Sequence, residues 1–220
     1  NIFNVLGILG LTAVFFPVAI EKKNMKFEIP LCIAVSVLLM ILAFNFFNGT
    51  AATIGRFDGW ILLLSFVGFL WYSFARDRKD SNDSTENITD EISPLWLAIV
   101  KVVGGLALLI VSCDFFVDNA VLIAKRFGVN DAFISLTLIA CGTSLPELAA
   151  SVAAAVKKNT DMALGNIVGS NIFNITLILG LSSHVMPLTS SGITYIDYIV
   201  LIVAAVPVLV IGLVGDINRL

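Results

Sequence analysis

Long apolar runs separated by short polar segments dominate the chain. A transmembrane helix needs roughly 20 consecutive, mostly apolar residues. Seven segments approach that length: residues 1–20, 30–47, 60–75, 95–124, 132–156, 162–186 and 198–214. The runs are continuous rather than alternating, which disfavours a membrane β-barrel. The pattern therefore predicts an all-α polytopic membrane protein with about seven transmembrane helices.

One polar segment divides the chain into two parts. Nine charged residues lie between positions 76 and 93, and acidic residues outnumber basic ones there. Such a segment cannot bury an apolar face, so we interpret residues 76–94 as a solvated, acidic linker. The predicted organisation is a first part over residues 1–75, the linker over residues 76–94 and a second part over residues 95–220.

Lysine and arginine concentrate in alternate connections, which predicts the orientation of the spans. Cytoplasmic loops of membrane proteins carry an excess of these residues. Nine of them follow the first, third, fifth and seventh spans: Lys22, Lys23, Lys26, Arg76, Arg78, Lys79, Lys157, Lys158 and Arg219. Three lie in the other connections: Arg56, Lys125 and Arg126. We therefore expect a multi-pass protein of the plasma or inner membrane, with the linker in the cytoplasm.

Composition agrees with this class and excludes several others. Hydrophobic residues make up 58% of the 220 residues and charged residues 13%, whereas soluble domains are about 25% charged. The mean hydropathy is +0.98. A net charge of −3 provides no basic surface for nucleic acid, and the apolar content excludes a disordered chain. The expected surroundings of the protein are therefore the lipid bilayer.

A sequence repeat links the first and sixth spans. Residues 1–18 read NIFNVLGILGLTAVFFPV and residues 171–188 read NIFNITLILGLSSHVMPL, so nine of 18 positions are identical at an offset of 170. The copies are five spans apart, and an odd number of spans reverses the direction of the chain. Inverted repeats are typical of secondary transporters, whose substrate site lies near the midplane where the two halves meet.

The fifth span carries a carboxylate in the middle of an apolar segment. Glu147 ends the sequence A-C-G-T-S-L-P-E, and a charge at this depth costs roughly 3 kcal/mol on insertion scales unless a cation or water offsets it. Thr143 and Ser144 precede it by four and three residues, so we expect the three oxygens on one helix face. Pro146 should free the carbonyl of Gly142. This all-oxygen set suits Ca²⁺ or Na⁺.

The sixth span adds neutral oxygens. Ser170 and Asn174 lie four residues apart in G-N-I-V-G-S-N-I-F-N and share a helix face. Asn4 is the counterpart of Asn174 in the first copy of the repeat. We expect the fifth and sixth spans to pack together with Glu147, Thr143 and Asn174 converging. We also expect Asn4 to approach Asn174 across a pseudo-twofold axis in the membrane plane.

These residues also have simpler interpretations. Hydroxyl and small residues often serve packing in membrane helices, and Ser170 alone would be read in that way. A protonated Glu147 could form hydrogen bonds with its neighbours without an ion. The sequence has no Cys/His metal cluster and no phosphate-binding glycine loop, which favours neither an enzyme nor a cofactor.

The motifs G-T-S-L-P-E and G-N-I-V-G-S-N-I-F-N closely resemble the second α-repeat of the sodium/calcium exchanger family, within the calcium/cation antiporter superfamily. N-I-F-N at residues 1–4 resembles the end of the first α-repeat. The resemblance implies part of a ten-helix fold of two inverted five-span repeats, with residues 1–75 as about helices 3–5 and residues 95–220 as about helices 6–9. It further implies an ion site formed by Thr143, Ser144, Glu147, the Ala140 carbonyl, Ser170, Asn174 and Asn4.

The chain departs from the family pattern at two points. Many members carry Asp at the position of Asn174, so one negative charge is missing and the ion stoichiometry does not carry over. The chain also starts inside the first α-repeat, without an initiator methionine. We therefore expect a fragment whose partners include its own missing helices one, two, part of three, and ten.

The leading hypothesis is a secondary antiporter that exchanges Ca²⁺ for Na⁺ by alternating access, with these two ions as transported species and no cofactor. Two alternatives stay open. In a Ca²⁺/H⁺ antiporter, Glu147 would carry the proton. A fragment that does not transport would fold or associate only with its missing helices.

Overall fold

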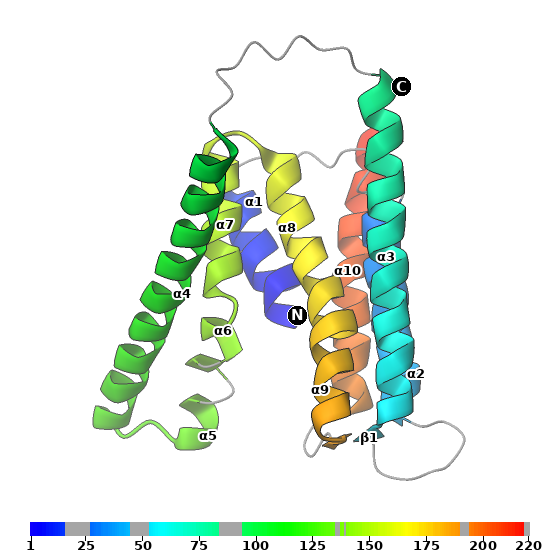
Figure 1. The fold of residues 1–220 in the computed structure, drawn as a ribbon. Helices are drawn as coiled ribbons and strands as arrows, with labels where there is room; N and C mark the ends of the chain where they lie inside the picture. Colours follow the sequence, from blue (N-terminus) through cyan, green and yellow to red (C-terminus); the bar gives the residue numbers. More distant parts are fainter. Residues whose placement is uncertain are drawn as a thin grey trace. The chain divides into compact units, whose positions relative to one another are not determined.

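Helices form almost all of the regular structure. The computed structural model describes residues 1–15, 27–44, 53–83, 94–134, 137–138, 140–189 and 194–217. In chain order the helical elements are the π-helical turn η1 (Asn4–Ile8), α1 (Leu9–Phe15), α2 (Ile29–Phe44), α3 (Arg56–Asp83), α4 (Leu95–Arg126), α5 (Asp131–Ile134), α6 (Ala140–Gly142), α7 (Leu145–Val156), α8 (Thr160–Phe173), the π-helical turn η4 (Asn174–Ile178), α9 (Leu179–Val185) and α10 (Tyr195–Ile217) (Figure 1).

These helices confirm the predicted fold class. Three described stretches are long and apolar enough to cross a membrane: Arg56–Ala75, Leu95–Arg126 and Asp161–Val185. Four shorter apolar stretches are helical as well: Asn4–Val14, Ile29–Phe44, Leu145–Val156 and Tyr195–Val210. Each of the seven overlaps a different one of the seven predicted spans.

The helix α3 is longer than the membrane span that it contains. The span ends at Ala75, as expected, whereas the helix continues through Asp83 and so includes the first residues of the predicted linker. The apolar pattern therefore predicts the extent of the span but not that of the helix. The rest of the predicted linker, residues 84–93, lies outside the described residues.

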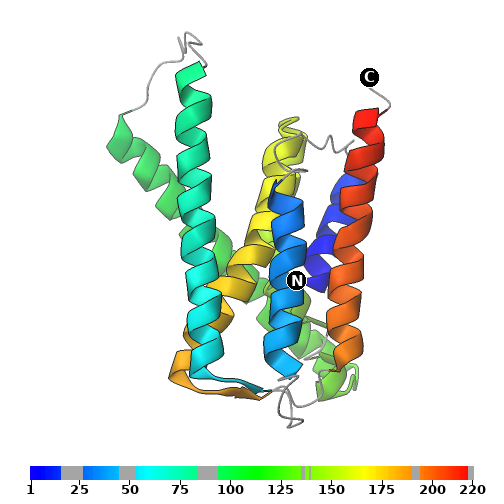
Figure 2. The same cartoon turned by 90° about the vertical axis from the view of Figure 1, so that its right-hand side faces the viewer.

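The chain forms two compact units, the first made of residues 1–82 and 150–220 and the second of residues 83–149. These units reflect contacts within the chain, whereas the expected division rests on the charged segment at residues 76–94, so that organisation stays a proposal. In the first unit α2 and α10 run side by side (Figure 2). Their shared core also takes residues from α8 and η4: Ile29, Cys32, Val35, Leu39, Leu164, Val168, Ile172, Ile175, Tyr198 and Leu201. The α2 residues recur every three to four positions and so form one helix face.

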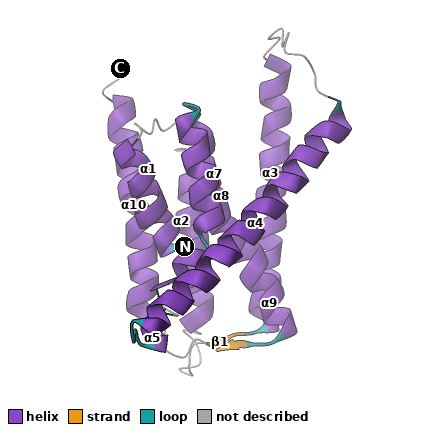
Figure 3. Ribbon diagram, turned by 90° about the vertical axis from the view of Figure 1, so that its left-hand side faces the viewer, coloured by secondary structure: helices purple, strands orange, loops and turns teal. Residues whose placement is uncertain are grey.

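A short antiparallel strand pair closes one end of the first unit, and the sequence analysis did not foresee it. β1 (Thr53–Ile54) precedes α3, and β2 (Leu188–Thr189) follows α9 (Figure 3). Thr53 pairs with Thr189 and Ile54 with Leu188. Two-residue strands are too short to leave an alternating pattern in a sequence.

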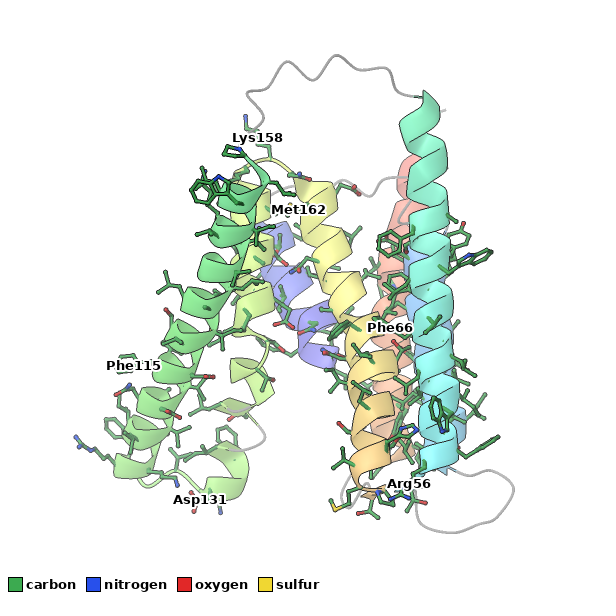
Figure 4. The ribbon with its side chains drawn as sticks, in the orientation of Figure 1. Arg56, Phe66, Phe115, Asp131, Lys158 and Met162 are labelled. Atoms are coloured by element: carbon green, nitrogen blue, oxygen red, sulfur yellow. The ribbon has the colours of Figure 1, made fainter. Side chains whose placement is uncertain are left out.

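α3 and α9 approach each other closely where Gly59 of α3 faces the backbone carbonyl of Gly180 of α9. A Cβ at position 59 would lie 2.9 Å from the carbonyl oxygen of Gly180 and 2.8 Å from Cε1 of His184. Nearby, Trp60 packs edge to face on His184 at a ring-centroid distance of 4.8 Å. Further along, Phe66 makes the same kind of contact with Phe173 (Figure 4). Gly59 therefore permits the approach of these two helices.

We expect Gly59→Ala to lower the free energy of unfolding by roughly 1–3 kcal/mol, as overpacked cores do. The new methyl group would meet the backbone of α9, which cannot rotate away. The measurement is thermal unfolding of the purified protein. Gly68→Ala on the same helix is the control, because a Cβ there has no neighbour within 4 Å. Equal unfolding temperatures for the two variants would contradict this packing.

In the second unit, α4 carries an apolar surface along its whole length. None of its residues is buried, and Phe115 is 72% exposed and points outward (Figure 4). At its end, Lys125 forms an ion pair of 3.2 Å with Asp131 of α5. A Cβ at Gly142 would clash with the Val117 side chain, so α6 packs closely on α4. An apolar helix of this kind is compatible with lipid.

Candidate cation site

The sequence repeat is also a structural repeat. η1 starts at Asn4 and η4 starts at Asn174, and the helices α1 and α9 that follow them start at Leu9 and Leu179. Every one of these starts is offset by 170 residues. In both copies the asparagine carbonyl accepts a hydrogen bond from the backbone N–H five residues later. Single π turns often occur at functional sites, and here each begins on a predicted site asparagine.

Hydrogen bonds between asparagine side chains join the two copies. Nδ2 of Asn174 donates to Oδ1 of Asn1 at 3.2 Å, and Nδ2 of Asn4 donates to Oδ1 of Asn171 at 3.1 Å. Asn1 corresponds to Asn171 in the repeat, and Asn4 corresponds to Asn174. The two bonds are therefore the same contact made twice, which is the pattern expected around a twofold axis.

This contact refines the predicted approach of the two copies. The segments that carry Asn4 and Asn174 do meet, but each of these residues bonds to the first asparagine of the opposite N-I-F-N rather than to its own counterpart. The sequence analysis missed Asn1 and Asn171. The signal was present, because N-I-F-N has two asparagines in both copies, and only the second was considered.

Asn4, like Asn171, lies deep in this group. It is fully buried, and its Nδ2 lies 3.3 Å from Oγ of Ser170 in addition to its bond with Asn171. Among the described residues, its Oδ1 atom has no hydrogen-bond partner. A buried acceptor in this state costs roughly 1–3 kcal/mol unless water or an ion fills the place. Ser170, Asn4 and Asn174 thus provide neutral oxygen donors of the kind that Ca²⁺ and Na⁺ accept.

A side-chain cap fixes the start of α8, the helix that carries Ser170 and leads into η4 at Asn174. Asn159 precedes α8, and its Oδ1 accepts a hydrogen bond from the backbone N–H of Met162 at 3.0 Å. Nearly two turns into the helix, Asn166 donates to Oγ of Ser151 on α7 at 2.9 Å. These contacts set the position of α8 along α7, and thereby the depth of the site residues that α8 carries.

The second group of predicted residues lies around a break in the fifth span. α6 ends at Gly142, α7 begins at Leu145, and Thr143 and Ser144 form the turn between them. The expected continuous helix face for Thr143, Ser144 and Glu147 was therefore wrong. The reason is Pro146, which occupies the second position of α7. The first N–H groups of a helix have no partner within it, so a proline there starts the new helix instead of bending an old one.

Glu147 belongs to the first turn of α7. The backbone N–H of Leu148 bonds to the carbonyl of Ser144 at 3.0 Å, which makes Ser144 the residue that precedes the helix. Ser-x-x-Glu at this place has the spacing of a capping box, and a helix N-terminus stabilises a carboxylate. Ser144 is buried, Thr143 is exposed, and the Oε2 atom of Glu147 is buried. The break thus presents a carboxylate and two hydroxyls at one helix start.

The predicted site residues form two groups. Asn4, Ser170 and Asn174 belong to the first unit, where Asn1 and Asn171 connect them. Thr143, Ser144 and Glu147 belong to the second unit, with Ala140 at the start of α6. The convergence of Glu147 and Thr143 with Asn174 stays a prediction.

Comparison with known proteins gives consistent matches. The family model described as "Sodium/calcium exchanger protein" matches residues 1–75 and 97–220. The putative antiporter CaxA of Alkalimonas amylolytica is 41% identical over 192 residues, which cover 85% of this chain and 58% of CaxA. The inner membrane protein YrbG of Escherichia coli K12 is 33% identical over 219 residues, which cover 94% of this chain and 64% of YrbG.

A solved structure of the sodium/calcium exchanger from Methanococcus jannaschii matches the fold. The TM-score is 0.72 at 28% sequence identity, and the match covers 96% of this chain and 64% of that one. The chain thus spans about 60% of the length of the proteins that it matches. The fold and the multi-pass membrane character follow from this match together with the seven apolar helical stretches.

Proposed function

Because the chain belongs to the sodium/calcium exchanger protein family, we propose that it acts in a secondary antiporter that exchanges Ca²⁺ for Na⁺ by alternating access. The observation that carries this proposal is the reciprocal asparagine contact between the two repeat copies. It joins two inverted copies at a buried polar cluster within apolar helices. Secondary transporters bind their substrates where inverted repeats meet, near the membrane midplane.

The donor set supports hard cations as substrates. In the proposed site Glu147 supplies negative charge. Neutral oxygens come from side chains and from one carbonyl: Thr143, Ser144, Ser170, Asn174, Asn4 and Ala140. Ca²⁺ takes six to eight oxygen ligands and accepts carboxylate, carbonyl, hydroxyl and water together. A set without thiolate or imidazole does not suit zinc or copper.

Competition for the same charge would couple the two ions. With few carboxylates in the site, Ca²⁺ and Na⁺ cannot both be held with full charge compensation. Binding of one ion then favours release of the other, and movement of the loaded site across the membrane yields exchange. The Lys and Arg distribution further supports a cytoplasmic position for residues 76–94, which we include in the proposal.

Calcium uptake into liposomes tests the proposal and separates it from its alternatives. Vesicles containing the protein and preloaded with Na⁺ are diluted into Na⁺-free medium with radioactive Ca²⁺. We expect uptake driven by the Na⁺ gradient, and none in protein-free vesicles. Uptake driven only by an outward H⁺ gradient would replace the proposal with Ca²⁺/H⁺ antiport, with Glu147 as proton carrier. No uptake under either gradient would mean that this chain alone does not transport.

A further inference from the structure

The two asparagines that begin N-I-F-N in each repeat copy contact the proposed ligands directly. We propose that Asn1 and Asn171 are positioning residues of the ion site, each orienting the side-chain amide of the ligand asparagine in the opposite copy. Asn171 would orient Asn4, and Asn1 would orient Asn174. This inference rests on the proposed function, because it assigns a role toward the ions of that same site.

The hydrogen bonds around Asn4 fix which way its amide faces. Ser170 donates its hydroxyl hydrogen to the carbonyl of Ile167 at 3.0 Å, so its Oγ can only accept from Asn4. Nδ2 of Asn4 therefore faces Ser170 and also donates to Oδ1 of Asn171. Both N–H groups of the amide are then used, and Oδ1, a buried atom without a hydrogen-bond partner among the described residues, is left for a cation.

The orientation of Asn174 follows from an equivalent chain of contacts. Nδ2 of Asn1 donates to the backbone carbonyl of Asn171 at 3.4 Å, and a carbonyl can only accept. Oδ1 of Asn1 must then face Asn174, which donates its own Nδ2 to that atom. The Oδ1 atom of Asn174 is consequently turned away from Asn1. In both copies, the first asparagine accepts and the second donates.

The direction of these bonds matters because an amide has two ends of opposite character. Its oxygen attracts a cation, whereas its N–H groups repel one. Without an acceptor in the opposite copy, the ligand amide would be free to turn its N–H groups toward the ion. Asn1 supplies that acceptor to Asn174, and Asn171 supplies it to Asn4 together with Ser170, so the oxygen end stays available on both sides of the pseudo-twofold axis.

A pair of double-mutant cycles tests the assignment. The single variants are Asn171→Leu, Asn4→Leu, Asn1→Leu and Asn174→Leu, since leucine has a similar volume and offers no acceptor. The measured quantities are the Ca²⁺ dissociation constant by calorimetry and the thermal unfolding temperature of the purified protein. We expect Asn171→Leu to weaken Ca²⁺ binding by roughly three- to tenfold, as the loss of one hydrogen bond would.

The coupling pattern separates positioning from general packing. In an Asn4→Leu background, Asn171→Leu should weaken Ca²⁺ binding no further, because it has no amide left to orient. In an Asn174→Leu background it should have its full effect, although Asn174 is only three residues away on the same chain segment. Asn1→Leu should show the reverse pattern, losing its effect only with Asn174→Leu. A loss of packing would not produce this crossed dependence.

Each outcome bears on a separate claim. Additive effects of Asn171→Leu and Asn4→Leu in a protein that binds Ca²⁺ would overturn the positioning role and leave the proposed function standing. A parental protein that binds neither Ca²⁺ nor Na⁺ would overturn the proposed function and the positioning role with it. If Asn171→Leu does not fold, the cycle between Asn1 and Asn174 tests the same assignment, because Asn1 is only half-buried.

Discussion

Glu147→Gln is expected to abolish Ca²⁺ transport while the protein still folds. Glutamine keeps the size of the side chain and one oxygen acceptor at the start of α7, but it removes the negative charge. Two unit charges about 4 Å apart interact by about 4 kcal/mol at the effective dielectric of a protein surface, and a divalent ion gains more. We therefore expect Ca²⁺ affinity to fall by roughly a hundredfold or more. The measurement is vesicle flux together with Ca²⁺ titration.

Asp131→Asn provides the matched control for this loss of charge. Asp131 also begins a helix in the second unit, but it is exposed and pairs with Lys125. Removing an exposed ion pair changes stability by about 0–1 kcal/mol and should leave transport unchanged. Parental flux in Glu147→Gln, or an equal loss in both variants, would count against Glu147 as the charge of the site.

The second large effect is expected for Asn174→Asp, which should tighten Ca²⁺ binding by about tenfold or more. A second carboxylate compensates a divalent ion better than an amide does, because the desolvation cost of an ion grows with its charge. The variant should also change the dependence of Ca²⁺ binding on Na⁺, since a second charge can hold another monovalent ion. Calcium titration at several fixed Na⁺ concentrations measures both effects.

Asn174→Asp should also lower the stability of the ion-free protein. Asn174 donates Nδ2 to Oδ1 of Asn1, and aspartate has no hydrogen to donate. The two oxygens would repel, so the ion-free variant should unfold at a lower temperature than the parental protein and recover stability with Ca²⁺.

Asn159→Asp is the control, because it adds the same charge fifteen residues away, at the exposed start of α8, where aspartate can still accept the hydrogen bond from the backbone N–H of Met162. Unchanged or weaker Ca²⁺ binding by Asn174→Asp would argue against Asn174 as a ligand.

The spans and the repeat could be predicted from the sequence because both leave a direct trace in residue type. Apolar runs of about 20 residues follow from the thickness of the bilayer, and the N-I-F-N copies carried an offset of 170 residues that the structure repeats at η1 and η4. The chain runs in opposite directions through the two copies, which is typical of inverted repeats that meet at a substrate site. This predicted that the two segments lie together.

Other features of the site depend on backbone geometry that residue type does not determine. In the π turns at Asn4 and Asn174, backbone N–H groups bond to carbonyls five rather than four residues earlier, which no side-chain pattern marks. Pro146 is compatible with a kink or with a new helix start, and the choice depended on the turn at Thr143 and Ser144. Asn1 and Asn171 contact Asn174 and Asn4 only in the folded protein, where two segments 170 residues apart in the sequence lie together.

The most direct test of the account is a structure of the protein soaked with Ca²⁺ or Sr²⁺. The account predicts an ion within about 2.3–2.6 Å of a carboxylate oxygen of Glu147, with the amide oxygens of Asn4 and Asn174 turned toward it and their nitrogens toward Asn171 and Asn1. An ion held by residues of only one of the two groups, or asparagine nitrogens facing the ion, would contradict it.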